Sequence, residues 1–179
     1  QVPDEASAFF VSSLRNNGYL SEEVLDDLLI YRIMYTDAES LSQYLDVSGD
    51  LAERIINCRN EISGFTQAAS LLKTKELTQT RIQRALLHSI LQIREVPLSV
   101  PYSRVLGFRK ESSPLLKEIK KNSTLPVLTK LADSDALLDE TGKRLLSETT
   151  VASNLYEKLL CKKNGQKFIH EYQKQIVIL

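Results

Sequence analysis

Apolar side chains recur every three or four residues through the first half of the chain, and short polar stretches interrupt them. This is the spacing of α-helices that bury one face. It predicts a helix that starts after Ser21, and further short helices over residues 5–16, 37–45, 49–63 and 65–73. The first half is therefore predicted to be an all-helical cluster with short connections.

The pattern changes after Pro101, because prolines interrupt the helical periodicity. Residues 102–108 are predicted to form a buried strand that ends at Gly107, residues 115–121 a helix, and residues 125–129 a second strand. A strand, a helix and a strand in fewer than 30 residues predict a compact βαβ unit with parallel strands.

The last third returns to helical spacing before it ends in an alternating, then apolar, segment. Two helical segments are predicted to flank Gly142 between residues 133 and 161, and residues 172–179 are predicted to be a terminal strand that joins the sheet. The predicted fold class is α+β, predominantly α: an N-terminal helical cluster, then a small βαβ unit with flanking helices and a C-terminal strand. The expected domains are a helical domain over 1–95 and a small α/β subdomain over 96–179 packed on it.

Composition narrows the class of protein. No apolar run approaches the roughly 20 residues that a bilayer crossing needs, so no membrane partner is expected. Cys58 and Cys161 lie far apart in segments of helical spacing, a usage that favours a reducing, cytoplasmic location over a disulfide framework. The chain begins without an initiator methionine, and we expect it to be a piece of a longer protein.

The helix predicted to begin after Thr78 has two arginines, Arg81 and Arg84, near its first turn. They oppose the partial positive charge of a helix N-terminus, and a bound anion would relieve that conflict. With His88 they form a polar stripe, separate from the apolar face. Exposed N–H groups and two guanidiniums could hold phosphates. The alternative is that both arginines are solvated or pair with Glu76 and with acids elsewhere in the fold.

The net charge is zero, but the charges are unevenly distributed. Residues 1–72 carry 4 Lys/Arg against 12 Asp/Glu, residues 73–130 carry 12 against 4, and residues 131–179 carry 7 against 7. A basic middle third in a neutral chain fits a shaped contact with RNA or another polyanion better than indiscriminate binding. Such charges are also common on faces that are merely solvated.

A second candidate phosphate site lies in the predicted βαβ unit. Ligands of such units collect at the carboxyl ends of strands and at the helix N-terminus. Arg109, Lys110, Ser112 and Ser113 occupy that place in the sequence. The alternative interpretation is a solvated basic loop.

Other kinds of site are disfavoured. Residues 40–59 have the rhythm of a helix-turn-helix, but Asp50 and Glu53 would face phosphates, so an ordinary helix pair is preferred. The two histidines, His88 and His170, have no metal-ligand cluster around them, and there is no glycine-rich phosphate loop or nucleophile motif. No catalytic residue, metal site or cofactor site is predicted.

Several blocks taken together resemble the C-terminal part of bacterial tRNA(Met) cytidine acetate ligases. The most specific is Lys73-Thr-Lys-Glu-Leu-Thr-Gln-Thr-Arg-Ile-Gln-Arg-Ala-Leu-Leu-His88. It is followed by Pro101-Tyr-Ser-Arg-Val-Leu-Gly-Phe108, Leu115-Leu-Lys-Glu-Ile-Lys120 and Leu125-Pro-Val-Leu-Thr-Lys130, with Leu51-Ala-Glu-Arg-Ile55 and Ala152-Ser-Asn-Leu-Tyr156 as weaker companions. The resemblance covers about residues 50–179.

The resemblance implies a function that spacing alone does not. Enzymes of that family activate acetate with ATP and transfer the acetyl group to N4 of the wobble cytidine of tRNA(Met). Their ATP site and His-x-Gly-His signature belong to an N-terminal nucleotidyltransferase domain, and this sequence has no such signature. The chain is thus expected to be the tRNA-binding C-terminal region, inactive alone, with tRNA and the missing N-terminal domain as partners and ATP and acetate as cofactors of the parent only.

The expected RNA contacts are ten of the basic residues in these blocks and in the segments between them. They are Lys73, Lys75, Arg81, Arg84, Arg104, Arg109, Lys110, Lys117, Lys120 and Lys121. One departure bears on them: a basic-aromatic pair is expected after Lys75, and this chain has Glu76-Leu77. The alternative function is a non-enzymatic helical protein-protein interaction domain.

Overall fold

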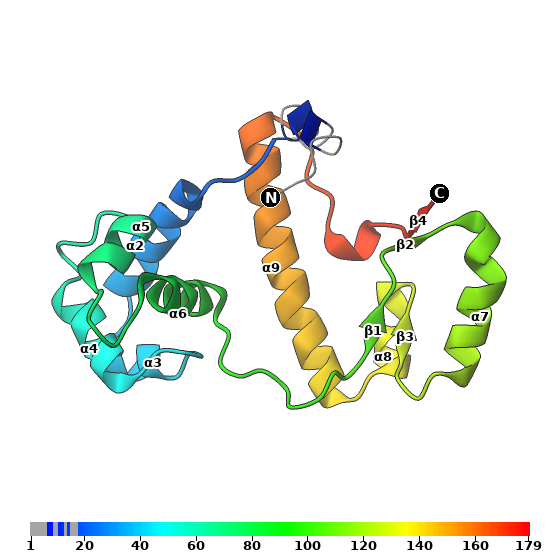
Figure 1. The fold of residues 1–179 in the computed structure, drawn as a ribbon, viewed down its shortest axis with the longest axis horizontal. Coiled ribbons are helices and arrows are strands. Elements are labelled where there is room, and N and C mark those ends of the chain that lie inside the picture. The colour runs from blue at the N-terminus through cyan, green and yellow to red at the C-terminus, as the bar shows by residue number, and fades with distance from the viewer. Residues whose placement is uncertain (1–6, 9–10, 13, 15–17) are drawn as a thin grey trace. The chain divides into compact units, whose positions relative to one another are not determined.

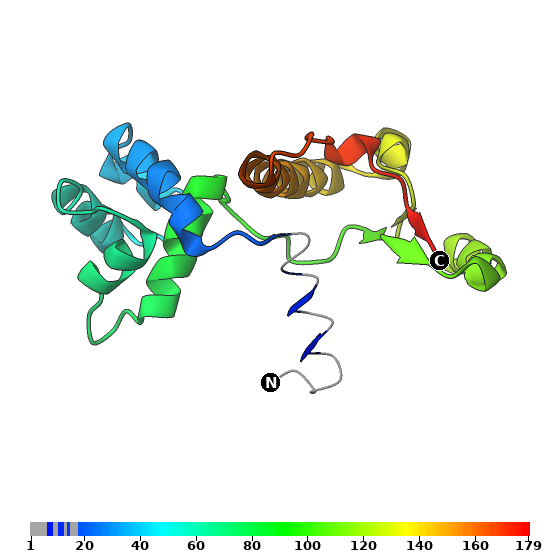
Figure 2. The ribbon, with the colours of Figure 1, turned by 90° about the horizontal axis from the view of Figure 1, so that it is seen from above.

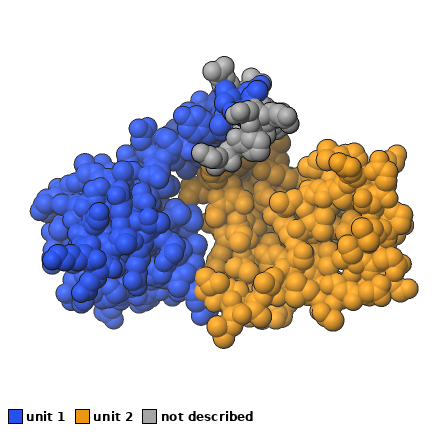
Figure 3. All heavy atoms as spheres, in the orientation of Figure 1, with its two compact units in different colours: residues 1–95, 158–166 blue, residues 96–157, 167–179 orange. Residues whose placement is uncertain are grey.

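The computed structural model describes residues 7–8, 11–12, 14 and 18–179, which fall into two compact units. Unit 1 comprises residues 1–95 and 158–166, and unit 2 comprises residues 96–157 and 167–179 (Figure 3). The predicted division into domains 1–95 and 96–179 stays a prediction. The units differ from it in one respect, because the last turns of a long C-terminal helix group with unit 1.

Unit 1 is a cluster of short helices (Figure 1). Much of the helix predicted over 5–16 lies outside the described residues. The helices that follow are η1 (Glu22–Leu25), α2 (Asp26–Met34), α3 (Ala38–Ser42), α4 (Gly49–Asn57), α5 (Phe65–Leu71) and α6 (Gln79–Leu91).

Polar side chains cap three of these helices. Asp37, Ser48 and Thr78 each accept a backbone N–H of the first turn of α3, α4 and α6. Such a bond satisfies one of the donors that a helix N-terminus leaves unpaired. The predicted helix starts after Thr78 and after Ser21 are both confirmed, although Ser21 makes no side-chain cap and its hydroxyl donates to Glu23.

The core of unit 1 depends on α6, where Ile82, Ala85 and Leu86 are fully buried. A long-range contact orders the helices around it. Oδ1 of Asp26, at the start of α2, accepts the backbone N–H of Phe65 at 2.7 Å and so caps α5 from a distant part of the chain. A polar residue on one helix therefore fixes the beginning of another.

Unit 2 contains a parallel pair of strands that are joined by a helix. Strand β1 (Ser103–Arg104) pairs in parallel with β3 (Val127–Leu128), and α7 (Ser113–Asn122) connects them. In two views the strands lie between α7 and the unit 2 part of α9 (Glu140–Asn164) (Figures 1 and 2). The other elements of unit 2 are β2 (Gly107–Phe108), η2 (Lys110–Ser112), η3 (Leu131–Asp133), α8 (Ser134–Leu137), η4 (Glu171–Gln173) and β4 (Val177–Ile178).

The single buried strand predicted over 102–108 is wrong. The segment forms β1 and β2, which belong to two separate two-stranded sheets, and neither strand is buried. Gly107 begins β2 instead of ending a strand. The partner strand β4 approaches so closely that a Cβ at Gly107 would stand 3.0 Å from the carbonyl oxygen of Val177. The terminal strand therefore joins β2 and not the β1–β3 sheet.

The predicted break at Gly142 is also wrong, since Gly142 lies in the first turn of α9. Its backbone N–H donates to Oδ1 of Asp139 at 2.7 Å, so the aspartate, three residues earlier, marks the start of the helix. The interruption falls at residues 138–139 instead, between α8 and α9.

The fold class is α+β and mostly α, as predicted at that level. Within the described ranges, every helix is too short or too polar to cross a bilayer.

Leu86→Ala tests the importance of the α6 face. The side chain is fully buried, so its truncation should lower the free energy of unfolding by about 2–5 kcal/mol through lost burial and a cavity. Leu98→Ala is the control, because Leu98 is fully exposed and its loss should change that free energy by less than about 0.5 kcal/mol. Urea denaturation followed by circular dichroism measures both, and equal effects would contradict the assignment.

Candidate nucleic-acid interface

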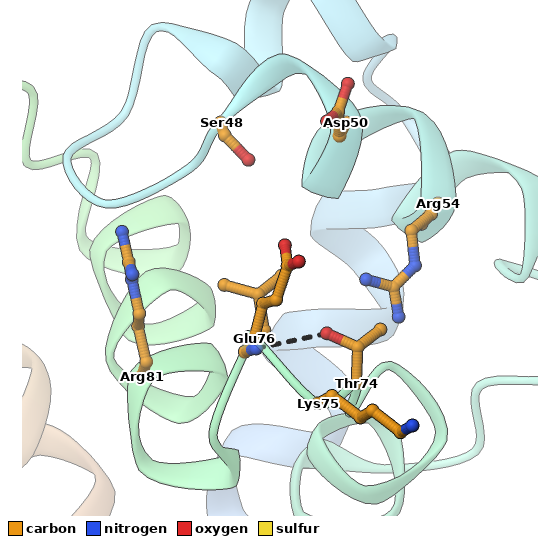
Figure 4. A pocket seen from close by; sticks show the side chains of 8 residues that line it. Ser48, Asp50, Arg54, Thr74, Lys75, Glu76 and Arg81 are labelled. Atoms are coloured by element: carbon orange, nitrogen blue, oxygen red, sulfur yellow. Dashed lines mark hydrogen bonds between the residues drawn. The ribbon is translucent and has the colours of Figure 1, made fainter.

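A cleft of about 560 Å³ in unit 1 brings together some of the predicted RNA contacts (Figure 4). It lies where α4 and α6 begin, beside the loop that joins α5 to α6. Two predicted contacts, Lys75 and Arg81, line it. The full lining is Ser48, Asp50, Arg54, Thr74, Lys75, Glu76, Leu77 and Arg81.

The cleft holds charges of both signs. Figure 4 shows the carboxylate of Glu76 in the middle, between Arg54 and Arg81, while the amino group of Lys75 points away from the centre. The loop that carries Glu76 is shaped by a 3.0 Å bond from the backbone N–H of Leu77 to Oγ1 of Thr74. An anion entering this cleft therefore meets two guanidiniums and must also displace or neutralise a carboxylate.

Arg84 does not join Arg81 in the cleft. Its Nε donates to Oδ2 of Asp46 at 2.7 Å, and Nδ1 of His88 lies 3.3 Å from the same oxygen. The hydrogen bond from Arg84 holds the pKa of Asp46 below its ordinary value, against the opposing effect of burial. For Arg84 the predicted alternative, pairing with an acid elsewhere in the fold, is the arrangement that the structure shows.

Arg104 is likewise paired, inside the framework of unit 2. Its Nη2 donates to Oε1 of Glu171 at 2.8 Å, and Nζ of Lys174 lies 3.3 Å from Oε2 of Glu171 and 3.0 Å from Oε2 of Glu157. Burial alone would raise the pKa of Glu171, but the bonds from Arg104 and Lys174 outweigh it and lower that pKa. Arg104 thus serves first to hold the C-terminal segment.

Lys117 and Lys120 line a second cavity, of about 220 Å³, together with Lys130. Of the predicted second phosphate site only Ser113 lines this cavity, and Arg109, Lys110 and Ser112 do not. The remaining predicted contacts, outside both cavities and exposed, are Lys73, Arg109, Lys110 and Lys121.

Several lining residues are absent from the predicted contacts, among them Ser48, Arg54 and Lys130. Arg54 and Ser48 reach the first cleft from α4 and its cap, and Lys130 reaches the second cavity just after β3. A signal for two of them was present, because Arg54 and Lys130 lie within blocks that carry the family resemblance. Within the residues that the structure describes, no three His, Cys, Asp or Glu side chains come together as metal ligands.

Comparison with known proteins places the chain in a family. The family model described as HIGH Nucleotidyl Transferase matches residues 1–172. The chain belongs to the HIGH nucleotidyl transferase family.

Curated relatives make the comparison more specific. The chain is 30% identical over 163 residues to the tRNA(Met) cytidine acetate ligase of Halothermothrix orenii, covering 84% of this chain and 39% of that protein. It is 30% identical over 178 residues to the protein of that name from a Thermoanaerobacter species, covering 94% and 43%. It is 31% identical over 159 residues to the protein of that name from Listeria welshimeri, covering 86% of this chain and 38% of that protein. The chain spans about two fifths of the length of these relatives.

Solved structures show the same fold. Apo Thermotoga maritima TmcAL superposes with a TM-score of 0.84 at 17% identity, covering 100% of this chain and 46% of that one. The same protein bound to alpha-thio ATP gives a TM-score of 0.82 at 17% identity, with 99% and 47% coverage.

Glu171→Gln tests the ionic contacts of unit 2. Because folding lowers the pKa of Glu171 below 4.5, its stabilisation is complete above about pH 4.5 and is lost as pH falls through the folded-state value. At pH 7 the variant should be less stable by about 1–3 kcal/mol, since Arg104 loses a charged acceptor. This deficit should shrink below pH 4.5.

The control is Glu140→Gln, which removes a carboxylate that is 93% exposed yet also pairs with a lysine, Lys143. Its effect should stay within about 0.5 kcal/mol. Denaturant titrations from pH 7 to pH 3 compare the two variants. A Glu171→Gln deficit that does not change with pH would contradict the assignment.

Proposed function

We propose that this chain is the tRNA-binding C-terminal region of a cytoplasmic tRNA(Met) cytidine acetate ligase and is not catalytically competent alone. In this proposal an N-terminal nucleotidyltransferase domain activates acetate with ATP, and the chain holds the tRNA beside that chemistry. The observation that carries it is the match along 84–94% of this chain to relatives of that name, which act on tRNA(Met).

The first cleft supports the proposal through its cations. Arg54 and Arg81 face a space wide enough for a phosphate group, and Lys75 stands at its margin. Guanidinium and ammonium groups on phosphates provide affinity without reading sequence, and this affinity decreases with salt as counterions are released. The cleft is then a place where the tRNA backbone is positioned, and the choice of tRNA depends on other contacts.

Glu76 moderates this binding. Its carboxylate lies among the cations, so it weakens the field that an incoming phosphate meets. Glu76, which stands where a basic-aromatic pair is expected, therefore lowers the affinity for a phosphate but leaves the cleft open.

The double variant Lys75→Gln/Arg81→Gln tests the proposal in the whole chain. It should weaken tRNA binding at least about 10-fold near 100 mM salt and reduce the slope of log affinity against log salt by about 1.5–2, because two phosphate contacts are lost. Fluorescence anisotropy with labelled tRNA(Met) measures both quantities.

The matched control Lys143→Gln/Lys162→Gln removes two cations of α9 that line neither cavity. It should change affinity less than about 3-fold. Equal losses in the two double variants, or no binding of tRNA by the unaltered chain, would reject the proposal.

Glu76→Gln should act in the opposite direction. Removing the carboxylate should tighten tRNA binding about 2- to 5-fold, which corresponds to an exposed charge interaction of about 0.4–1 kcal/mol. Glu53→Gln, on the exposed face of α4 outside the cleft, is the control and should leave affinity unchanged. The same anisotropy titration decides, and weaker binding by Glu76→Gln would exclude a phosphate in this cleft.

A further inference from the structure

The second cavity differs in kind from the first. Besides Lys117, Lys120 and Lys130 it is lined by apolar and hydroxyl-bearing side chains, and no described carboxylate lines it. The apolar residues are Phe108, Leu116 and Ile176, and the hydroxyls are those of Ser113 and Thr129. A lining that combines cations with apolar side chains suits a ligand that has an anionic group and a flat apolar face.

Separate parts of unit 2 build this cavity. Phe108 is the last residue of β2, Thr129 and Lys130 directly follow β3, and Ile176 precedes β4. The side of α7 that carries Leu116, Lys117 and Lys120 completes it. The lining therefore gathers where β2 and β3, strands of two separate sheets, end and where β4 begins.

The lysines are arranged to receive an anion. Nζ of Lys120 donates to Oγ1 of Thr129 at 3.0 Å, which orients the ammonium and leaves its other two donors available. Lys117 and Lys130 make no ion pair within the part of the chain that the structure describes. Three ammonium groups without a carboxylate among them are electrostatically complementary to a phosphate.

The size of the cavity limits the ligand. Sites for drug-sized molecules measure about 300–1,000 Å³. At about 220 Å³ this cavity is smaller, and it is open enough for its occupant to continue into solvent. A single aromatic base with its phosphate at the rim fits these limits, whereas a base-paired stem does not.

The geometry points to a pocket for one unstacked nucleotide of a single-stranded RNA segment. Its base lies on Phe108, Leu116 and Ile176, and its phosphate lies on Lys117, Lys120 and Lys130. Proteins that hold single strands combine such an apolar or aromatic platform with a basic rim. This inference rests on the proposed function for the source of the RNA, and it adds a contact that recognises an unpaired nucleotide to the backbone contact in unit 1.

The test is anisotropy of the whole chain with a labelled six-nucleotide single-stranded RNA. Lys117→Gln/Lys130→Gln should weaken binding at least about 10-fold. The control Lys143→Gln/Lys162→Gln removes two cations of α9 that do not line the cavity, and it should weaken binding less than about 3-fold. Equal losses of affinity in the two double variants would mean that the RNA responds only to exposed positive charge, and would overturn the inference.

Phe108→Leu separates base from phosphate contacts, since it keeps an apolar side chain but removes the aromatic platform. It should weaken binding of the hexamer about 5-fold or more and leave binding of the same hexamer made without bases unchanged. Leu115→Ala, an exposed change on α7, is the control and should have no effect. Thermal melts confirm that each variant is folded. An equal effect of Phe108→Leu on both hexamers would overturn the placement of the base.

Two further measurements separate the source of the nucleotide and the proposed function. Cytidine 5′-monophosphate should bind at least about 100-fold more weakly than the hexamer, and equal affinity would assign the pocket to a free nucleotide and reject RNA. If Lys75→Gln/Arg81→Gln weakens tRNA binding but Lys117→Gln/Lys130→Gln leaves the affinity for the hexamer unchanged, only the inferred nucleotide pocket is rejected. If the hexamer responds but tRNA does not bind, only the proposed function fails.

Discussion

The C-terminal segment of unit 2 is held by one carboxylate, that of Glu171, which is largely removed from solvent and bonded to Arg104 and Lys174. Such a group is tolerated only when cations compensate for its lost hydration. The position of this carboxylate sets the path of the residues that follow Glu171. Ile176 then completes the wall of the second cavity, and Val177 and Ile178 pair with β2. The second cavity therefore depends on a salt bridge that does not line it.

The same principle explains why the basic middle third offers fewer cations than its sequence indicates. Asp46 takes up Arg84, and Glu171 takes up Arg104. Both arginines stabilise the fold near the sites without lining the first cleft or adding a free charge to the second cavity. The net charge of the segment therefore overstates the field available to RNA, which comes from the cations left around two separate cavities.

Much of the local structure followed from neighbouring residues. Thr78 caps α6 because its hydroxyl reaches an N–H of the next turn, and the strand-helix-strand order of 102–129 produced the parallel pair. One error occurred where a distant residue decided, and the other where a local helix cap decided. Gly107 allows close approach of β4, which comes from the other end of unit 2, and Gly142 continues a helix that Asp139 had already capped. A glycine alone does not distinguish a break from a close contact.

The sequence by itself determined the mostly helical α+β class, the starts of several helices and the blocks that place the chain in its family, because apolar spacing and capping act over a few residues. Only the tertiary structure decided which cations remain for a ligand. Arg84 and its carboxylate are 38 residues apart, and Arg104 and its carboxylate are 67 apart. Pairing over such separations depends on how helices and strands pack, and no local pattern records it.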